Sequence, residues 1–429
     1  MSIRKMQVIL LGVLILLMPY HYILFAVLFK NISIFKLWRD IIMILIITLG
    51  LVKSKRIRYD SSLIIDLLFV LWNFFYIAIA PDKFKAINIA RVYLIPILLF
   101  HTVKNLYLSK HEIQKIGIKV MYNTIIICAY GLVQAYILGP SFLIRLGYGK
   151  NGSLQAAYYL SNYSGHILGR NIQRVVSTFS SANICAFYLC SIFILFLFVK
   201  DYINVSRQVY NVFMCLLIIT IILTFSRSSW LAIGIALIVS GRKQLKKFIV
   251  RRMNIILTLF FTALIALFAS NSIRNALIHI LMSSFSGTDT SIVSHYSTIE
   301  NAIKLIRNNP SGLGLGENGP RALNYGNSNL VESSFLLMAF EYGVIGAAFF
   351  LYDYIFLAVG AIKNRKIDKK SSELSLCLII FTLIAYFNIP YVQEIECTSL
   401  FFIFCGIAYC KIYTKRNMAR FKNHIIDDL

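Results

Sequence analysis

Charged residues are scarce in this sequence. Asp, Glu, Lys and Arg make up 14% of its 429 residues, whereas hydrophobic residues make up 58%. A soluble protein of this length needs far more charge on its surface, so the scarcity excludes that class and favours a polytopic membrane protein. Acidic residues are the scarcest, with 18 Asp and Glu against 43 Lys and Arg, which gives a net charge of +25. This excess could indicate nucleic-acid binding, but the basic residues cluster in short loops between apolar runs, which argues against it.

Several catalytic and structural motifs are also missing. No His, Cys and Asp residues stand at the spacing of metal ligands, and no loop expected to face outward contains the Asp-x-Asp pair of a metal-dependent sugar-nucleotide enzyme. The glycines at 312–316 follow no expected strand and lack the Gly-x-Gly-x-x-Gly spacing of a dinucleotide site. All 8 cysteines fall in or at the ends of apolar runs, which argues against a disulfide framework. We therefore expect no metal and no cofactor.

Long apolar runs dominate the chain. A helix needs about 20 apolar residues to cross a hydrocarbon core of about 30 Å. The sequence predicts an all-α, polytopic membrane protein with about twelve transmembrane helices, all within one integral membrane domain over residues 1–429. The first run is too long for a signal peptide and lacks a cleavage site, so we expect it to stay as a span. The runs lie at 7–29, 37–53, 63–80, 87–103, 116–138, 182–199, 208–225, 228–241, 253–270, 333–360, 372–390 and 396–413.

Basic residues are divided unevenly between the connections. When successive connections are assigned to alternate sides, one side contains both termini and most of the Lys and Arg residues, including the stretch K-S-K-R-I-R at 53–58. Loops rich in Lys and Arg stay in the cytoplasm. We therefore expect both termini to be cytoplasmic, and the basic clusters need no function beyond setting this topology.

Two connections, at 139–181 and 271–332, are much longer than the others, and both fall on the outward side. Long loops of this kind are usually functional. The first is rich in tyrosine and contains no Asp or Glu, but it contains the basic residues Arg145, Lys150, Arg170 and Arg174. This composition suits an anionic partner such as a phosphate group. Its tyrosines could stack on sugar faces or lie among lipid headgroups, and both interpretations stay open.

The second long connection contains a predicted amphipathic helix. Glu300 and Lys304 are four residues apart and form a supporting pair on its surface. Pro310 is expected to end the helix, and the glycines at 312–316 are expected to permit a tight turn or a close approach of backbone. The apolar residues recur at spacings of four and three, which is typical of a helix lying on the membrane or on other helices: Ile292, Tyr296, Ile299, Ile303 and Ile306.

Three arginines stand near the outward ends of apolar runs. Arg227 interrupts the stretch L-T-F-S-R-S-S-W between two short runs, so we expect it to lie below the outer surface, where a charge is usually functional. Arg91 lies a few residues inside its run, and Arg174 just precedes the run at 182–199. The guanidinium of Arg227 or of Arg91 could instead extend to the lipid headgroups. Together the three could surround a diphosphate, because guanidinium makes two-point contacts with phosphate oxygens.

Acid–base candidates are few on the outward side. Glu332 directly precedes an apolar run, and a carboxylate at a membrane boundary can act as a general base. The alternative is that Glu332 stabilises the start of a helix through the helix dipole. His295, at the edge of the amphipathic face, is the second candidate base, and it could also be an ordinary interfacial histidine.

Three stretches, in this order, resemble the bacterial O-antigen polymerase and O-antigen ligase group of membrane glycosyltransferases. They are R-V-V-S-T-F-S-S-A-N at 174–183, L-T-F-S-R-S-S-W at 223–230, and N-P-S-G-L-G-L-G at 309–316 followed by E-S-S-F-L-L-M-A-F-E-Y-G-V-I-G at 332–346. Each motif alone is loose, whereas the ordered set is fairly specific. The resemblance covers residues of about 170–350, together with the Arg91 region.

The resemblance implies a multi-span, GT-C-like glycosyltransferase fold in the bacterial inner membrane, with its active site facing the periplasm. The donor would be a glycan on undecaprenyl diphosphate, and the reaction would need no metal or nucleotide. Arg91, Arg174 and Arg227 match arginine-bearing segments of the family and would bind the diphosphate and stabilise its charge as it leaves. A separate chain-length regulator protein would be a further partner.

One departure from the family pattern separates its two activities. In the ligase pattern, a histidine stands where Glu332 stands here, eleven residues before Gly343. The missing histidine favours the polymerase, which joins one lipid-linked unit to another, over the ligase, which moves the glycan to lipid A core. The ligase stays an alternative, and so does a flippase that transports the same lipid-linked units. The base also stays open between Glu332 and His295.

Overall fold

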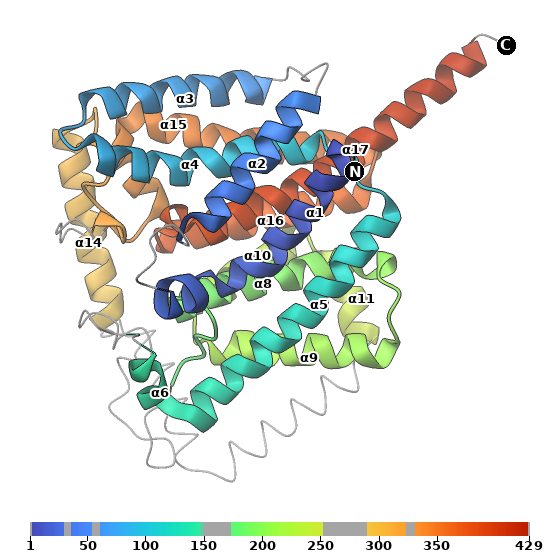
Figure 1. Cartoon of the computed structure of the whole chain (residues 1–429), viewed down its shortest axis with the longest axis horizontal. Helices are drawn as coiled ribbons and strands as arrows, with labels where there is room; N and C mark the ends of the chain where they lie inside the picture. The colour runs from blue at the N-terminus through green and yellow to red at the C-terminus, as the bar shows by residue number, and fades with distance from the viewer. Residues whose placement is uncertain are drawn as a thin grey trace.

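The structure is a computed structural model that describes residues 2–29, 36–53, 61–146, 148, 173–251, 290–322 and 331–427. Within these residues the chain is all-helical, with no β-strand among its elements, as the apolar runs predict (Figure 1). In chain order, the α-helices are α1 (Ile3–Leu17), α2 (Trp38–Lys53), α3 (Ser61–Ile79), α4 (Lys83–Lys104), α5 (Lys110–Val133), α6 (Gly139–Arg145), α8 (Ala182–Val199), α9 (Arg207–Leu223), α10 (Arg227–Val239), α11 (Arg242–Arg251), α14 (Thr290–Asn308), α15 (Ser334–Lys363), α16 (Lys369–Asn388) and α17 (Ile395–Asp427).

The number of membrane-crossing helices differs from the predicted one. Among the described residues, 8 helices are long and apolar enough to cross a membrane, which confirms a polytopic membrane protein but not twelve spans. Three predicted spans are shorter helices: α2 has 16 residues, α9 has 17 and α10 has 13. At a rise of 1.5 Å per residue, α10 is about 20 Å long, less than a hydrocarbon core of about 30 Å. The predicted span at 253–270 lies outside the described residues.

The connections between helices gather at two ends of the bundle. At the end that carries the N-terminus, Arg4 of α1 pairs with Glu112 of α5, and Lys370 of α16 pairs with Asp201, which follows α8. At the opposite end, helix α14 crosses the direction of the long helices and packs against α15 (Figure 1). This grouping follows the predicted alternation of connections, and which end faces the cytoplasm stays a prediction.

Burial differs strongly between the helices. Helix α8 and the Ile395–Lys415 part of α17 are mostly buried, and α4 packs closely against α17. A helix that is apolar on all sides can be stable only where it is surrounded, which explains the continuous apolar sequence of α8. In contrast, Leu71 and Phe74 of α3 are mostly exposed, as expected for a face toward lipid.

Helix α14 confirms the amphipathic helix predicted in the second long connection. It packs against α15, ends at Asn308 shortly before Pro310, and carries the exposed Glu300–Lys304 pair at 2.8 Å. The buried face differs in detail, because Ala302 is buried whereas Ile303 is 45% exposed. Spacings of three and four place residues on one side of a helix, but the position of the neighbouring helix decides which of them it covers.

A glycine kink joins the glycine-rich segment to α15. Gly343 interrupts α15 with a φ of 70°, which favours glycine. The backbone groups freed at the kink bond to the preceding segment: Leu313 N donates to Phe340 O at 2.7 Å, and Val344 N donates to Pro310 O at 3.0 Å. A Cβ atom at Gly343 would lie 2.6 Å from the carbonyl carbon of Ser311. The close approach of backbone predicted for the glycines is confirmed, and its partner is the kink.

Candidate functional site

The turn between α9 and α10 holds the first part of the candidate site. Leu223 ends α9 and Arg227 begins α10, so Arg227 lies at the first helical position. The segment at 173–181 runs alongside this turn: Val175 N donates to Leu223 O at 2.9 Å, and Arg174 Nε donates to Thr224 O at 2.8 Å. Two of the three sequence motifs, at 174–183 and 223–230, therefore meet here.

Arg174 and Arg227 lie near each other at this turn, and we call them the arginine pair. Burial lowers the pKa of Arg174 to about 10, and the like charge of Arg227 also lowers it. Nearby Tyr391 acts in the opposite direction and raises the pKa of Arg174. Arg174 is held in place by Thr224 and by Asn183, whose Oδ1 accepts from Nη2 at 2.7 Å. Arg227 is exposed. Two guanidinium groups together favour binding of a polyanion, which offsets their mutual repulsion.

Serine and tyrosine side chains connect the arginine pair to the 3-10 turn at Tyr391–Gln393, between α16 and α17. Ser226 Oγ donates to Ser229 Oγ at 3.0 Å, and Ser229 Oγ lies 3.5 Å from the Tyr391 hydroxyl. The Tyr391 hydroxyl donates to Asn183 O at 3.1 Å. The serines on either side of Arg227 thus help to fix the start of α10 against α8 and α16.

A second arginine cluster, formed by Arg39, Arg91 and Arg321, lies beside the same turn. Arg39 of α2 pairs with Glu396 at the start of α17. Arg91 of α4 pairs with Asp40 of α2, with 2.5 Å between Nη1 and Oδ2. Burial and then the charge of Arg39 lower the pKa of Arg321. The structure thus places Arg91 in a different cluster from the arginine pair, and its guanidinium already has a carboxylate partner.

Gln393 joins the second arginine cluster to the kinked helix α15. Its buried side chain donates from Nε2 to Asn318 O and to Glu341 Oε1, both at 3.1 Å. Its own carbonyl oxygen accepts from Arg321 Nε at 2.7 Å. Glu341, fully buried in α15, also accepts from the Tyr93 hydroxyl. Residues from four separate parts of the chain are therefore fixed around one amide side chain.

The two candidate bases lie near the N-terminal end of α15. Glu332 is half-buried and directly precedes Ser333, the N-cap of that helix. Its Oε2 accepts from Thr298 Oγ1 of α14 at 3.4 Å. Thr298 follows His295 by three residues, so Glu332 lies beside the turn of α14 that carries His295. The His295 side chain lies outside the described residues, and the catalytic role of either residue stays a prediction.

Sequence reasoning missed several residues of this end of the bundle. Glu341 could have been noticed, because a carboxylate in the middle of the run at 333–360 is costly to bury and such residues are usually functional. Arg39 stands near the start of the run at 37–53, where a basic residue draws no attention. Gln393 and Arg321 have no sequence signal, since only the fold brings them together.

These features define a polytopic membrane protein with a cluster of arginines and carboxylates at one end. Residues 212–351 match a family model described as O-antigen ligase. The match covers about a third of the chain and agrees with its resemblance to the O-antigen ligase and polymerase group. This family implies glycosyltransferase-like chemistry on a lipid-linked oligosaccharide. The match includes α9, α10, α14 and the kink of α15, and no curated protein sequence matches the chain.

Proposed function

We propose that this protein is a polymerase of O-antigen or of a related surface polysaccharide. It would transfer a growing glycan from undecaprenyl diphosphate to the non-reducing end of another lipid-linked repeat unit. The observation that carries the proposal is the arginine pair, formed where two family motifs meet, with Glu332 in place of the ligase histidine. Transfer to lipid A core, the ligase reaction, is the second candidate.

The arginine pair is proposed to bind the diphosphate of the donor. An acceptor hydroxyl oxygen attacks the anomeric carbon, the bond from that carbon to the diphosphate oxygen breaks, and the diphosphate leaves with an added negative charge. Guanidinium groups already fixed near that oxygen stabilise the charge as it develops. Arg174 suits this role because Thr224 and Asn183 hold it through two of its five N–H donors.

Glu332 is proposed to accept the proton of the attacking hydroxyl, and His295 is the second choice. Glu332 lies just before α15 and bonds to Thr298 of α14, the helix that contains His295. Helix α14 lies at the end of the bundle that we assign to the arginine pair. Glu332→Gln keeps the size of the side chain and removes its basicity, so elongation should fall strongly while the binding of donor is retained. If Glu332→Gln elongates normally and His295→Ala does not, His295 is the base.

The test uses purified protein with lipid-diphosphate-linked repeat units and measures glycan length. Wild-type protein should make long chains, and Arg227→Ala should lower the rate by about a hundredfold. Arg207→Ala, at the opposite end of α9, is the matched control and should elongate normally. In a second reaction that also contains lipid A core, single transfer to that acceptor without longer chains would indicate the ligase. In protein reconstituted into vesicles, movement of units across the membrane at unchanged length would indicate a flippase.

A further inference from the structure

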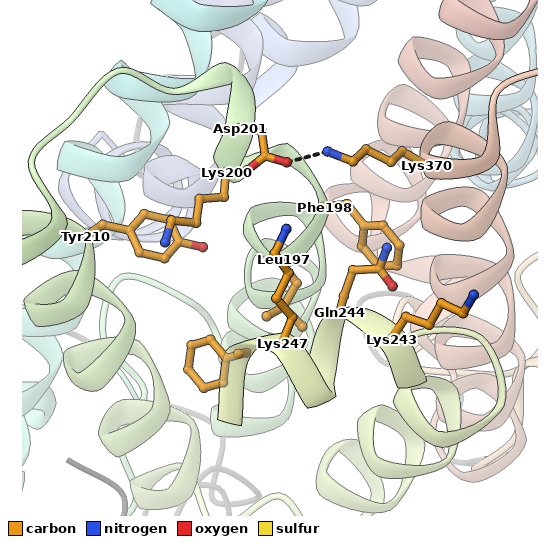
Figure 2. Close-up of a pocket in the computed structure, with 10 residues that line it drawn as sticks. Leu197, Phe198, Lys200, Asp201, Tyr210, Lys243, Gln244, Lys247 and Lys370 are labelled. Carbon is orange, nitrogen blue, oxygen red and sulfur yellow. Dashed lines mark hydrogen bonds and ion pairs between the residues drawn. The ribbon is translucent and has the colours of Figure 1, made fainter. Parts of the chain in front are cut away.

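A pocket lies at the end of the bundle opposite the arginine pair. The end of α8, the start of α9, helix α11 and the start of α16 surround it. The cavity is about 110 Å³, several times the space needed by one water molecule. Figure 2 shows the charged residues that line this cavity, which we call the basic pocket: Lys200, Asp201, Lys243, Lys247 and Lys370.

Positive charge dominates the basic pocket. Among the described residues that line it, Asp201 is the only acidic one, and it pairs with Lys370 (Figure 2). The Lys200 ammonium lies 4.7 Å from the centre of the Tyr210 ring, a cation–π contact that helps to hold it. Lysines gathered at one cavity favour binding of an anion with several oxygens, such as a phosphate group.

An apolar slot adjoins the basic pocket. The slot is about 70 Å³ and lies between α5, α8, α16 and α17. Phe198 and Lys370 line both cavities, so the lysine head groups and the apolar walls form neighbouring parts of one region. Side chains such as Ile116, Leu374 and Phe404 line the slot. Hydrocarbon is the chemistry that suits these walls.

Helix α11 places the basic pocket where lipid headgroups would lie. Its sequence R-K-Q-L-K-K-F-I-V-R puts basic residues on one side, whereas Phe248 is buried and packs against Phe193 of α8, with 5.8 Å between ring centres. A basic amphipathic helix of this kind lies in the membrane interface, and basic pockets between spans bind the headgroups of anionic lipids. Its end of the bundle is the one expected to face the cytoplasm.

We propose that the basic pocket binds the phosphate of an anionic membrane phospholipid, with part of an acyl chain in the apolar slot. Lys243 and Lys247 of α11 contact the phosphate together with Lys200 of the α8–α9 connection. A free phosphate ion would use only the lysines, so the adjoining apolar slot favours a lipid. The lipid would bridge α11, α8 and α16 and so stabilise this end of the bundle.

The test measures lipid binding by the full-length protein purified in an uncharged detergent. Native mass spectrometry counts bound phosphatidylglycerol, and thermal unfolding gives the accompanying rise in Tm. The double variant Lys243→Gln, Lys247→Gln should bind phosphatidylglycerol at least about tenfold more weakly, since each lost contact with a charged group is worth on the order of a tenfold change. The control Lys115→Gln, Lys246→Gln also removes two exposed positive charges, from positions that do not line the basic pocket.

Three outcomes would overturn the proposal. Equal loss of binding in the two double variants would mean that only the overall charge matters. An equal rise in Tm with inorganic phosphate would identify a free-anion site. An equal rise with phosphatidylcholine of the same acyl chains, which has the same phosphate but no net charge, would mean that the site does not select an anionic lipid. The unliganded Tm of each variant shows that loss of binding does not come from misfolding.

Discussion

The side chain of Arg174 shows how a half-buried charge is held ready for a ligand. Burial disfavours its charge and the neighbouring Arg227 disfavours it further, yet two oxygen acceptors fix the guanidinium beside the α9–α10 turn. Placing such a group in the fold costs stability, which a bound diphosphate would offset by supplying negative charge. A residue that only sets topology would not need to be buried or held at two points.

Arg174→Lys tests this geometry at constant charge. Lysine carries a single ammonium group and cannot reach Thr224 O and Asn183 Oδ1 as the planar guanidinium does. We expect a fall in the rate of elongation of about tenfold or more, because a hydrogen bond to a charged group contributes about 1.5–3 kcal/mol. Purified variants are compared by glycan length against time. Arg207→Lys, an exposed position at the start of α9, should match wild type, and an equally active Arg174→Lys would contradict the proposed role of the guanidinium.

Glu394 gives a pH dependence that can be measured as stability. Burial and then the charge of Glu396 raise the pKa of Glu394 to about 7, above its ordinary value. The folded protein therefore holds this proton up to a higher pH than the unfolded chain does, so the contribution of Glu394 to stability falls as pH rises toward 7. The Tm of the wild-type protein should fall as the pH rises from the ordinary pKa of a glutamate toward 7. The Tm of Glu394→Gln, whose side chain cannot ionise, should fall less. A steeper fall in the variant would contradict the raised pKa.

At the scale of elements, the contact between the glycine-rich segment and the kink of α15 orders this end of the bundle. The sequence predicts a close approach of backbone at 312–316, because glycines without a nucleotide-binding pattern suit a tight turn. The partner is not predictable, since Gly343 lies in an apolar run that reads as one continuous helix. The amphipathic pattern predicts α14 correctly, because the periodicity of apolar residues marks one face of a helix. It is wrong for Ile303, which is exposed, because the position of the neighbouring helix decides which residues of that face are buried.

Gly343→Ala should disrupt this contact. Alanine is strained at a φ of 70°, and its Cβ would lie 2.6 Å from the Ser311 carbonyl carbon. Strain of this kind costs on the order of 1–3 kcal/mol, so we expect a Tm lower by several degrees and a loss of elongation. Gly234→Ala in α10 is the control, because nothing lies within 4 Å of its added Cβ, and it should leave Tm unchanged or raise it slightly. An unchanged Tm in Gly343→Ala would mean that the kink is not required.

At the scale of the whole molecule, the apolar runs predict the positions of the helices much better than their lengths. Every predicted span within the described residues is helical, since apolar length and helical structure go together in a membrane. Helices α2, α9 and α10 are nevertheless short, and π-helical turns at Tyr22–Leu28 and Gln134–Leu138 extend α1 and α5. The second arginine cluster depends on contacts between residues as distant as Arg39 and Glu396, which no local pattern encodes.

The orientation of the bundle decides whether the arginine pair meets a periplasmic substrate. Positive-inside asymmetry predicts that the start of α4 lies outside and the start of α5 inside. The exposed positions Lys83 and Lys110 report on these two ends, and the native cysteines described by the structure are buried or half-buried, so they give little background. With a membrane-impermeant maleimide on spheroplasts, Lys83→Cys should react at once, whereas Lys110→Cys should react only after the membrane is permeabilised. The reverse pattern would place the arginine pair in the cytoplasm, where the proposed polymerisation of exported repeat units could not occur.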